Sequence, residues 1–156
     1  MDKSVLFTRI FNPSELNHLK SKKARYGSLK FSFTDKYLKE LKALLKEKHE
    51  CQIFAKDAKT RKIVGYCAGA ETLFPGFFFL AELFVAQEAQ GKGIGRSLLI
   101  FVINHARMSG LKGVVTETEV ENIPAQRLYK KCGFRRIKNP RFEGHTFRLM
   151  FQRDYN

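Results

Sequence analysis

An apolar run, a glycine-rich turn and a long apolar segment follow one another near the middle of the chain, and this succession restricts the fold more than any other feature. Phe77–Val85 is apolar apart from Glu82 and is long enough for a strand buried on both faces. Gln90–Arg96 is rich in glycine, and residues 97–108 carry the apolar positions of a mostly buried helix. A strand, a glycine turn and a helix N-terminus in this order are typical of phosphate binding, because backbone N–H groups converge there on an anion.

Around this unit the sequence predicts an α/β domain, which we expect to be single and to span residues 1–156. Strands are predicted at residues 4–10, 51–57, 62–68 and 113–120, and in the tail at 145–152. Helices are predicted from Phe11–Leu16 through the basic residues up to Arg25, from Thr34 to Leu45, and from Asn122 to Lys131.

The charge of the chain is strongly positive, with 29 Lys and Arg residues against 15 Asp and Glu and a formal net charge of +14. Such a field attracts anions, so it fits an acidic acceptor or a nucleic-acid surface, and generic solubility explains it equally well. No apolar stretch reaches the length of a membrane span, and Met1–Ser4 lacks the layout of a signal peptide. Cys51, Cys67 and Cys132 fit neither a disulfide framework nor a zinc site. We therefore expect a cytoplasmic protein with reduced thiols, no metal and no membrane contact.

The glycine-rich turn departs from two common phosphate-binding motifs. No Gly-Lys-Ser/Thr ends it, so it is not a P-loop, and its third glycine falls one residue early for the dinucleotide fingerprint. Gln90-x-x-Gly93-x-Gly95 instead resembles the pyrophosphate-binding motif Arg/Gln-x-x-Gly-x-Gly/Ala of the GNAT superfamily of acyl-CoA-dependent N-acetyltransferases.

A second segment is similar to the other signature of that superfamily. It reads Asn122-x-x-Ala125-x-x-Leu128-Tyr129-x-x-x-Gly133-Phe134 and follows a predicted strand at the usual distance from the first motif. The resemblance extends from about Phe78 to Phe134, and the N-terminal part and the tail carry no motif. It implies a mixed central sheet of about six to seven strands, with splayed central parallel strands, flanked by about four helices.

The resemblance also implies acetyl-CoA as co-substrate, bound in the cleft where the two central strands separate. The turn would hold the pyrophosphate, and the preceding strand would offer backbone groups to the pantetheine arm and the thioester carbonyl. The residues so implied are Leu83, Phe84, Val85, Gln90, Gly91, Lys92, Gly93, Ile94, Gly95, Arg96, Asn122 and Tyr129. Two of them have ordinary structural alternatives, because Asn122 before Pro124 is a natural helix N-cap and Tyr129 fits a core position.

Two residues are predicted to move protons. By resemblance, Tyr129 matches the tyrosine that protonates the departing CoA thiolate, and a phenol has suitable basicity for that task. Glu82 is a lone carboxylate in an apolar run, and strand alternation predicts that it shares a face with Leu80 and Phe84. If that face opens into the cleft, Glu82 takes a proton from the acceptor ammonium, and the alternative is a salt bridge to Lys or Arg. Glu117 and Glu119 on the next strand are rival bases.

Several other residues have ordinary structural interpretations beside the functional ones. Arg127, Lys130 and Lys131 fit either the adenosine 3′-phosphate or a solvated helix face. Cys132 is not favoured as a covalent carrier, because no base adjoins it and the family transfers directly, and the histidines at 105 and 145 are interpreted as structural.

The sequence thus predicts transfer of an acetyl group from acetyl-CoA to a primary amine by direct attack in a ternary complex. An RNA- or ribosome-associated module acting on a protein or aminoacyl-tRNA amine is an alternative, suggested by the charge. A weakly catalytic acyl-CoA binder is another. The acceptor, small molecule or protein, is not identified, and a homodimer is among the expected states because dimers are common in the family.

Overall fold

The structure, a computed structural model, describes residues 4–9, 14, 17, 19–20, 23–26, 29–32, 34–46, 51–71, 74–138 and 148–155. A seven-stranded mixed sheet has the order β1-β4-β5-β6-β7-β9-β8, and β2 and β3 form a separate two-stranded sheet. The strands of the large sheet are β1 Val5–Thr8, β4 Cys51–Asp57, β5 Ile63–Ala70, β6 Phe77–Val85, β7 Gly113–Glu119, β8 Arg135–Ile137 and β9 Arg148–Asp154. β6 and β7 pair in parallel, and the other neighbours pair antiparallel.

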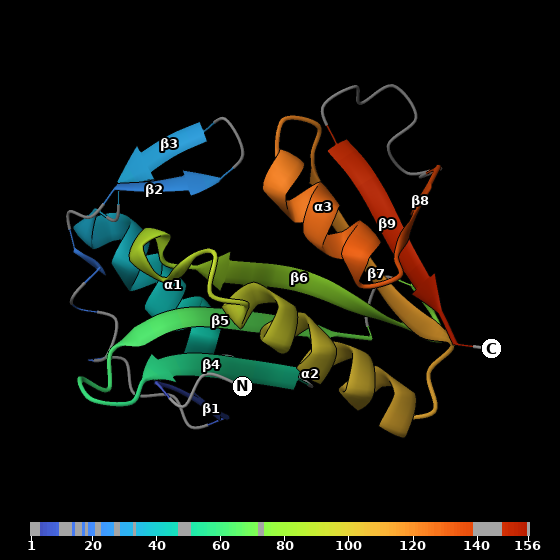
Figure 1. Cartoon of the computed structure of the whole chain (residues 1–156), viewed down its shortest axis with the longest axis horizontal. Coiled ribbons are helices and arrows are strands. Elements are labelled where there is room, and N and C mark those ends of the chain that lie inside the picture. The colour runs from blue at the N-terminus through green and yellow to red at the C-terminus, as the bar shows by residue number, and fades with distance from the viewer. Residues whose placement is uncertain are drawn as a thin grey trace.

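Three α-helices occur in the described residues, α1 Asp35–Lys46, α2 Ile94–Met108 and α3 Ile123–Lys131. α2 crosses one face of the sheet and α1 lies behind it, as Figure 1 shows. The main core forms between the sheet and α2, with Leu98, Leu99 and Val102 fully buried, and it includes Tyr129 of α3. α2 and α3 therefore cover the same face of the sheet.

One of the four predicted helices, the basic helix up to Arg25, is contradicted at its C-terminal end. Lys23–Tyr26, placed in the basic helix up to Arg25, forms strand β2, which pairs antiparallel with β3 at Leu29–Ser32. Apolar and polar residues alternate in both segments, and pairing with a neighbouring strand outweighs a weak helical pattern. The predicted start of that helix at residues 11–16 lies outside the described residues, apart from Ser14.

Most other elements match the sequence prediction closely. β4 and β6 have the predicted bounds, α1 begins one residue after Thr34, and α2 begins at Ile94 rather than Ser97. The short edge strand β8 was not predicted, and β9 covers the predicted tail strand from Arg148 onward, whereas His145 lies outside the described residues. Within the described parts of the chain, no helix combines the length and apolar character needed to cross a bilayer.

Candidate functional site

The glycine-rich turn leads from the end of β6 to the N-terminus of α2. β6 ends at Val85, a short 3-10 helix covers Gln87–Ala89, and Gly93 is the N-cap of α2. Gly91 and Gly93 have φ values of +77° and +78°, a conformation that glycine adopts without strain, and a Cβ on either would meet nothing within 4 Å. In the part of the chain that the structure describes, no side chain caps the first turn of α2, so its leading N–H groups are available to an external anion.

Side chains around the turn fix it and give it positive charge. The Gln90 amide donates a hydrogen bond to the Val85 carbonyl at 3.0 Å, so Gln90 ties the turn to the end of β6. Lys92 and Arg96 are exposed beside the glycines. With the N-terminal end of the α2 dipole, these cations favour a negatively charged ligand at the turn.

The predicted separation of the central parallel strands appears in their register. β6 pairs with β7 from Phe77 opposite Gly113 to Leu80 opposite Thr116, and the pairing stops there although β6 continues to Val85 and β7 to Glu119. At this last step the Thr116 hydroxyl donates to the Leu80 carbonyl at 3.0 Å. The two strands therefore separate beyond Leu80, toward the C-terminal end of β6, which leads into the glycine turn.

A β-bulge corrects the predicted orientation of Glu82. Leu80 pairs with Gly69 and Glu82 with Ala68, so Ala81 has no partner in β5 and the alternation of faces reverses there. Leu83 pairs with Cys67, whose thiol donates to the Leu98 carbonyl of α2 at 3.7 Å, so Leu83 faces α2.

Glu82 and Phe84 consequently share the opposite face, where the Phe84 ring lies 5.4 Å from that of Tyr66. Glu82 is thus not on the face of Leu80, which belongs to the core beneath α2. The expected shared face with Phe84 is confirmed.

The rival bases lie on the same face as Glu82. Val114 of β7 belongs to the core beneath α2, so Thr116 and Thr118 continue that face by alternation. Glu117 and Glu119 then face the other side, across the separation from Glu82. The three carboxylates are partly buried.

The second signature begins with a structural role for Asn122. Its side-chain oxygen accepts a hydrogen bond from the Ala125 N–H at 3.2 Å, so the N-cap interpretation is confirmed. Tyr129 is 4% exposed, belongs to the core shared with α2, and its ring lies 5.7 Å from that of Phe134. The structure thus brings Tyr129 to the same face of the sheet as the α2 N-terminus.

Cys132 ends α3 and is buried. Burial raises the pKa of its thiol, and the nearby guanidinium groups of Arg96 and Arg153 oppose that rise. A raised pKa disfavours the thiolate that a covalent carrier needs, which agrees with the sequence interpretation. His105 packs edge-on against Phe78 with ring centroids 5.5 Å apart, a packing contact in keeping with its structural interpretation.

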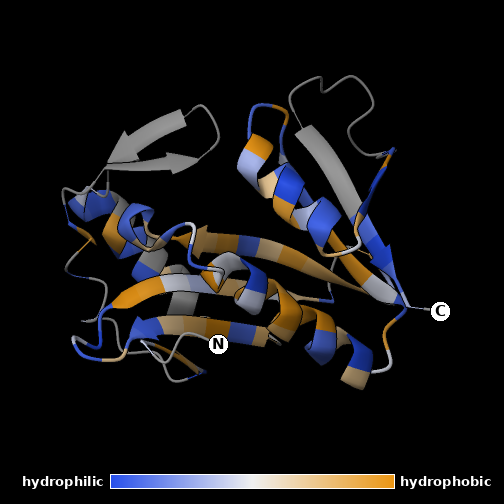
Figure 2. Ribbon diagram, in the orientation of Figure 1, coloured by the Kyte–Doolittle hydropathy of each residue, from blue (hydrophilic) through white to orange (hydrophobic). Residues whose placement is uncertain are grey.

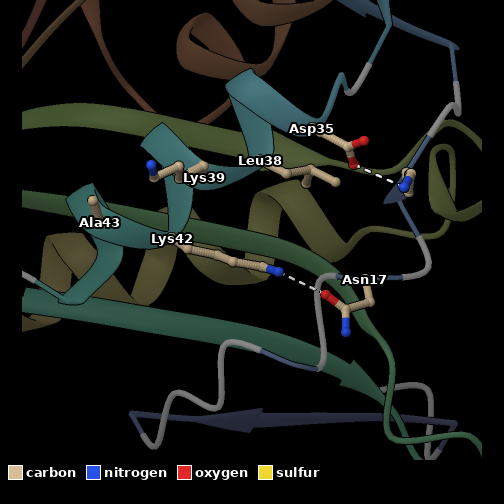
Figure 3. A pocket seen from close by; sticks show the side chains of 7 residues that line it. Asn17, Asp35, Leu38, Lys39, Lys42 and Ala43 are labelled. Atoms are coloured by element: carbon tan, nitrogen blue, oxygen red, sulfur yellow. Dashed lines mark hydrogen bonds and ion pairs between the residues drawn. The ribbon is translucent and has the colours of Figure 1, made fainter.

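A cavity of about 740 Å³ lies beside α1, and Figure 3 shows the side chains that line it. Lys42 donates to the Asn17 side-chain oxygen at 2.6 Å, and Lys20 forms an ion pair with Asp35 at 3.0 Å. The residues that line the cavity belong to α1 and to the segment around Asn17 and Lys20, and α1 lies on the side of the sheet opposite α2. Among the described residues, no group of three or more His, Cys, Asp or Glu side chains is arranged to hold a metal ion.

Sequence reasoning missed the two threonines of β7. The Thr116 hydroxyl bonds to the Leu80 carbonyl at the last paired step of β6 and β7, and Thr118 is 4% exposed with its hydroxyl lacking a hydrogen-bond partner in the described structure. The sequence did contain a signal for them, because hydroxyl residues occupy alternate positions, 116 and 118, of a strand that was predicted to lie next to the cleft.

Comparison with known proteins places these features in a family. The sequence model of the Acetyltransferase (GNAT) family matches residues 17–134. A GCN5-related N-acetyltransferase 6, chloroplastic, from Arabidopsis thaliana is 37% identical over 65 residues, which are 42% of this chain and 23% of that protein. This chain therefore matches less than a quarter of the length of that curated relative.

Two solved structures share the fold over nearly the whole chain. The ribosomal-protein-S18-alanine N-acetyltransferase of Escherichia coli has a TM-score of 0.70 and 16% identity, covering 96% of this chain and 93% of the other. A Bacillus anthracis protein solved in complex with acetyl coenzyme A has a TM-score of 0.67 and 12% identity, covering 98% of each chain. At these identities the likeness concerns the fold.

Proposed function

The chain belongs to the GNAT acetyltransferase family, and on that premise we propose that it transfers an acetyl group from acetyl-CoA to a primary amine in a ternary complex. One observation carries the proposal. The parallel pairing of β6 and β7 stops at Leu80 and Thr116, and β6 then leads through a 3-10 turn and the glycine turn to the N-terminus of α2, whose N-cap Gly93 has no capping side chain. An opened strand pair beside an anion site suits a ligand with a polar arm and a diphosphate.

The described residues fit acetyl-CoA as co-substrate. The amides of Gly91 to Arg96, with the side chains of Lys92 and Arg96, would hold the diphosphate at the positive end of α2. The β6 backbone at Leu83–Val85, which is paired with β5 but no longer with β7, would bind the pantetheine arm on the side that β7 has left, and an N–H there would stabilise the oxyanion. The Gln90 side chain donates to the Val85 carbonyl, so within this proposal its part is to position the turn.

The proposed reaction has two proton transfers, one by Glu82 on one face of the sheet and one by Tyr129 on the other. The Glu82 carboxylate takes a proton from the acceptor ammonium, through water, and the neutral amine attacks the thioester carbonyl carbon. As the C–S bond breaks, the Tyr129 hydroxyl donates its proton to the CoA thiolate. The attacking nitrogen loses its second proton to solvent as the tetrahedral intermediate collapses to the amide. Exchange with solvent then returns a proton to Tyr129 and removes one from Glu82, so the products are the amide, free CoA and one proton. Glu117 or Glu119 would take the role of Glu82 if that residue is not the base.

We place the acceptor on the face opposite α2. Glu82 points to that face by register, and α1, which lines the cavity, lies on that side of the sheet. The acceptor would thus approach from the α1 side while acetyl-CoA occupies the α2 and α3 side, so the two substrates meet through the gap between β6 and β7.

The direct test is a screen of amine acceptors that detects free CoA by a thiol reagent, with acetyl-CoA alone as control. The described cysteines are buried, so their background reaction is slow. Acetyl-CoA-dependent thiol release with at least one amine, and mass-spectrometric detection of its acetyl amide, would support the proposal. Binding of acetyl-CoA without transfer to any amine would support the weakly catalytic binder instead.

A basic surface on α3 and β8 supports a second candidate function, contact with RNA or the ribosome. Figure 2 shows hydrophilic residues along α3 and β8. Five exposed cations define this surface, Arg127, Lys130, Lys131, Arg136 and Lys138. The neighbouring Arg135 forms an ion pair with Asp154 at 3.1 Å, and among the described residues none of the five has an ion pair with Asp or Glu.

If this surface contacts phosphates, binding to a single-stranded RNA should weaken steeply as salt rises. The double variant Lys130→Glu/Lys131→Glu should reduce both the affinity and the salt slope. The control Lys36→Glu/Lys39→Glu makes the same charge change on α1 and should reduce binding much less. A flat response of affinity to salt would eliminate the RNA function.

A further inference from the structure

Thr118 carries a buried hydroxyl that the fold does not explain. The residue lies on β7 and is 4% exposed. Its backbone pairs with Leu149 of β9, whereas Oγ1 has no hydrogen-bond partner within the described structure. Buried polar side chains nearly always have a partner, and valine would fill the same space without an unpaired oxygen.

The position of Thr118 connects this hydroxyl with the separated strands. Thr116, two residues earlier, has the same orientation by strand alternation and bonds to the Leu80 carbonyl of β6. Thr118 is the next residue on that face, beyond the last paired step, where β6 is no longer hydrogen-bonded to β7. The strand that supplies an acceptor to Thr116 therefore supplies none to Thr118.

We propose that Thr118 Oγ1 binds a polar group of the pantetheine arm where the arm enters the gap between β6 and β7. The inference rests on the proposed use of acetyl-CoA. Pantetheine has two amides and ends in the thioester, so it presents carbonyl oxygens and N–H groups along its length. A hydroxyl both donates and accepts, so it pairs with either kind of group. Thr118 is thus a ligand-binding and positioning residue.

The test compares Thr118→Val with Thr118→Ser. Valine removes the hydroxyl at nearly constant volume, and serine keeps it. For each variant, calorimetry measures the affinity for CoA and for adenosine 3′,5′-bisphosphate, which lacks the pantetheine arm. Thermal unfolding of the ligand-free protein is measured in parallel.

We expect Thr118→Val to weaken CoA binding roughly three- to tenfold, the equivalent of one hydrogen bond, while binding of the bisphosphate is unchanged. Thr118→Ser should bind CoA within about twofold of the wild type. The ligand-free Thr118→Val protein should unfold at the same temperature as the wild type or higher, because no internal hydrogen bond is lost. The combination of preserved stability and weakened CoA binding separates ligand contact from structural damage.

Equal CoA affinity in wild type and Thr118→Val would overturn this inference alone. A lower unfolding temperature of ligand-free Thr118→Val would also overturn it, because the hydroxyl would then have an internal partner. Failure of the wild type to bind CoA would overturn the proposed function as well, and the unfolding data would still report on the hydroxyl.

Discussion

The Thr116 hydroxyl donates a hydrogen bond to the Leu80 carbonyl at 3.0 Å, at the last step where β6 and β7 are paired. Thr116 is 2% exposed and Leu80 is 1% exposed, so the bond is fully enclosed. A side chain thereby satisfies a buried carbonyl at the point where the parallel strands part. The Thr116 hydroxyl thus gives the Leu80 carbonyl a hydrogen-bond donor beside the separation that the proposed function needs.

Replacing Thr116 by Val should destabilise the protein. The Leu80 carbonyl would remain buried without its donor, so the free energy of unfolding should fall by about 1–3 kcal/mol. Thr116→Ser keeps the donor and should lose less. Urea denaturation of both variants checks this, and a Thr116→Val protein as stable as the wild type would show that the bond is unimportant. The contrast with Thr118→Val, expected to preserve stability, makes the two threonines a matched pair.

Gly93→Ala should be moderately destabilising, because an L-residue at φ +78° is strained by about 1–2 kcal/mol. Gly110→Ala is its matched control, since Gly110 lies beyond the other end of α2 with φ +72° and also has open space around a Cβ. Both variants should lose similar stability in urea denaturation. Only Gly93→Ala should raise the KM for acetyl-CoA, roughly tenfold, which is the equivalent of weakening one hydrogen bond to a charged group. Similar KM values in the two variants would contradict a role for the turn in binding.

Tyr129→Phe should lower kcat roughly 100-fold or more while leaving the affinity for CoA nearly unchanged, because general acid catalysis typically contributes at least that factor. Tyr155→Phe is the control, since it removes the hydroxyl of another tyrosine, one that bonds to the Ile103 carbonyl at 2.6 Å and plays no part in the proposed reaction. Steady-state kinetics and calorimetry measure the two quantities. Full kcat in Tyr129→Phe would exclude it as the acid.

Glu82→Gln should remove the rise of kcat/KM with pH that deprotonation of a catalytic base produces. The amide has similar size but takes no proton, so the variant should be slow at all pH values unless the acceptor is already neutral. Glu117→Gln and Glu119→Gln serve as comparisons because they share the face of Glu82. Whichever variant abolishes the acidic limb of the profile identifies the base, and an unshifted profile with full activity in Glu82→Gln would exclude Glu82.

Alkaline stability should depend on Tyr155. Burial raises the pKa of its hydroxyl from about 10 to about 12, so the folded state favours the protonated form. The contribution of this group to stability is therefore complete below pH 10 and is lost as the pH rises through 12. The difference in unfolding free energy between wild type and Tyr155→Phe should shrink across that window, as urea denaturation at several pH values can measure. A constant difference would contradict the raised pKa.

The sequence predicted the parts of the fold whose local signals agree with their packing. The bounds of β6 follow from its apolar run, and α3 begins where Asn122 and Pro124 indicate. The family signatures are local in the chain and led directly to the glycine turn. Residues that follow a strong local pattern could therefore be placed before the structure was known.

Features that depend on partners distant in the chain could not be predicted. The bulge at Ala81 follows from pairing with β5 and reverses the face of Glu82, and a single strand read by alternation gives no sign of it. Strand β2 forms by pairing with β3, and its short sequence also fits a helix. The importance of Thr116 and Thr118 depends on where the β6–β7 pairing stops, which is a property of two strands together.

The most direct measurement of the central claim is a calorimetric titration of the wild-type protein with acetyl-CoA, repeated with Gly93→Ala and Gly110→Ala. We predict one binding site per chain, an affinity about tenfold weaker in Gly93→Ala, and a wild-type affinity in Gly110→Ala. No binding by the wild type, or an equal loss in both glycine variants, would contradict the claim that the turn before α2 binds the CoA diphosphate.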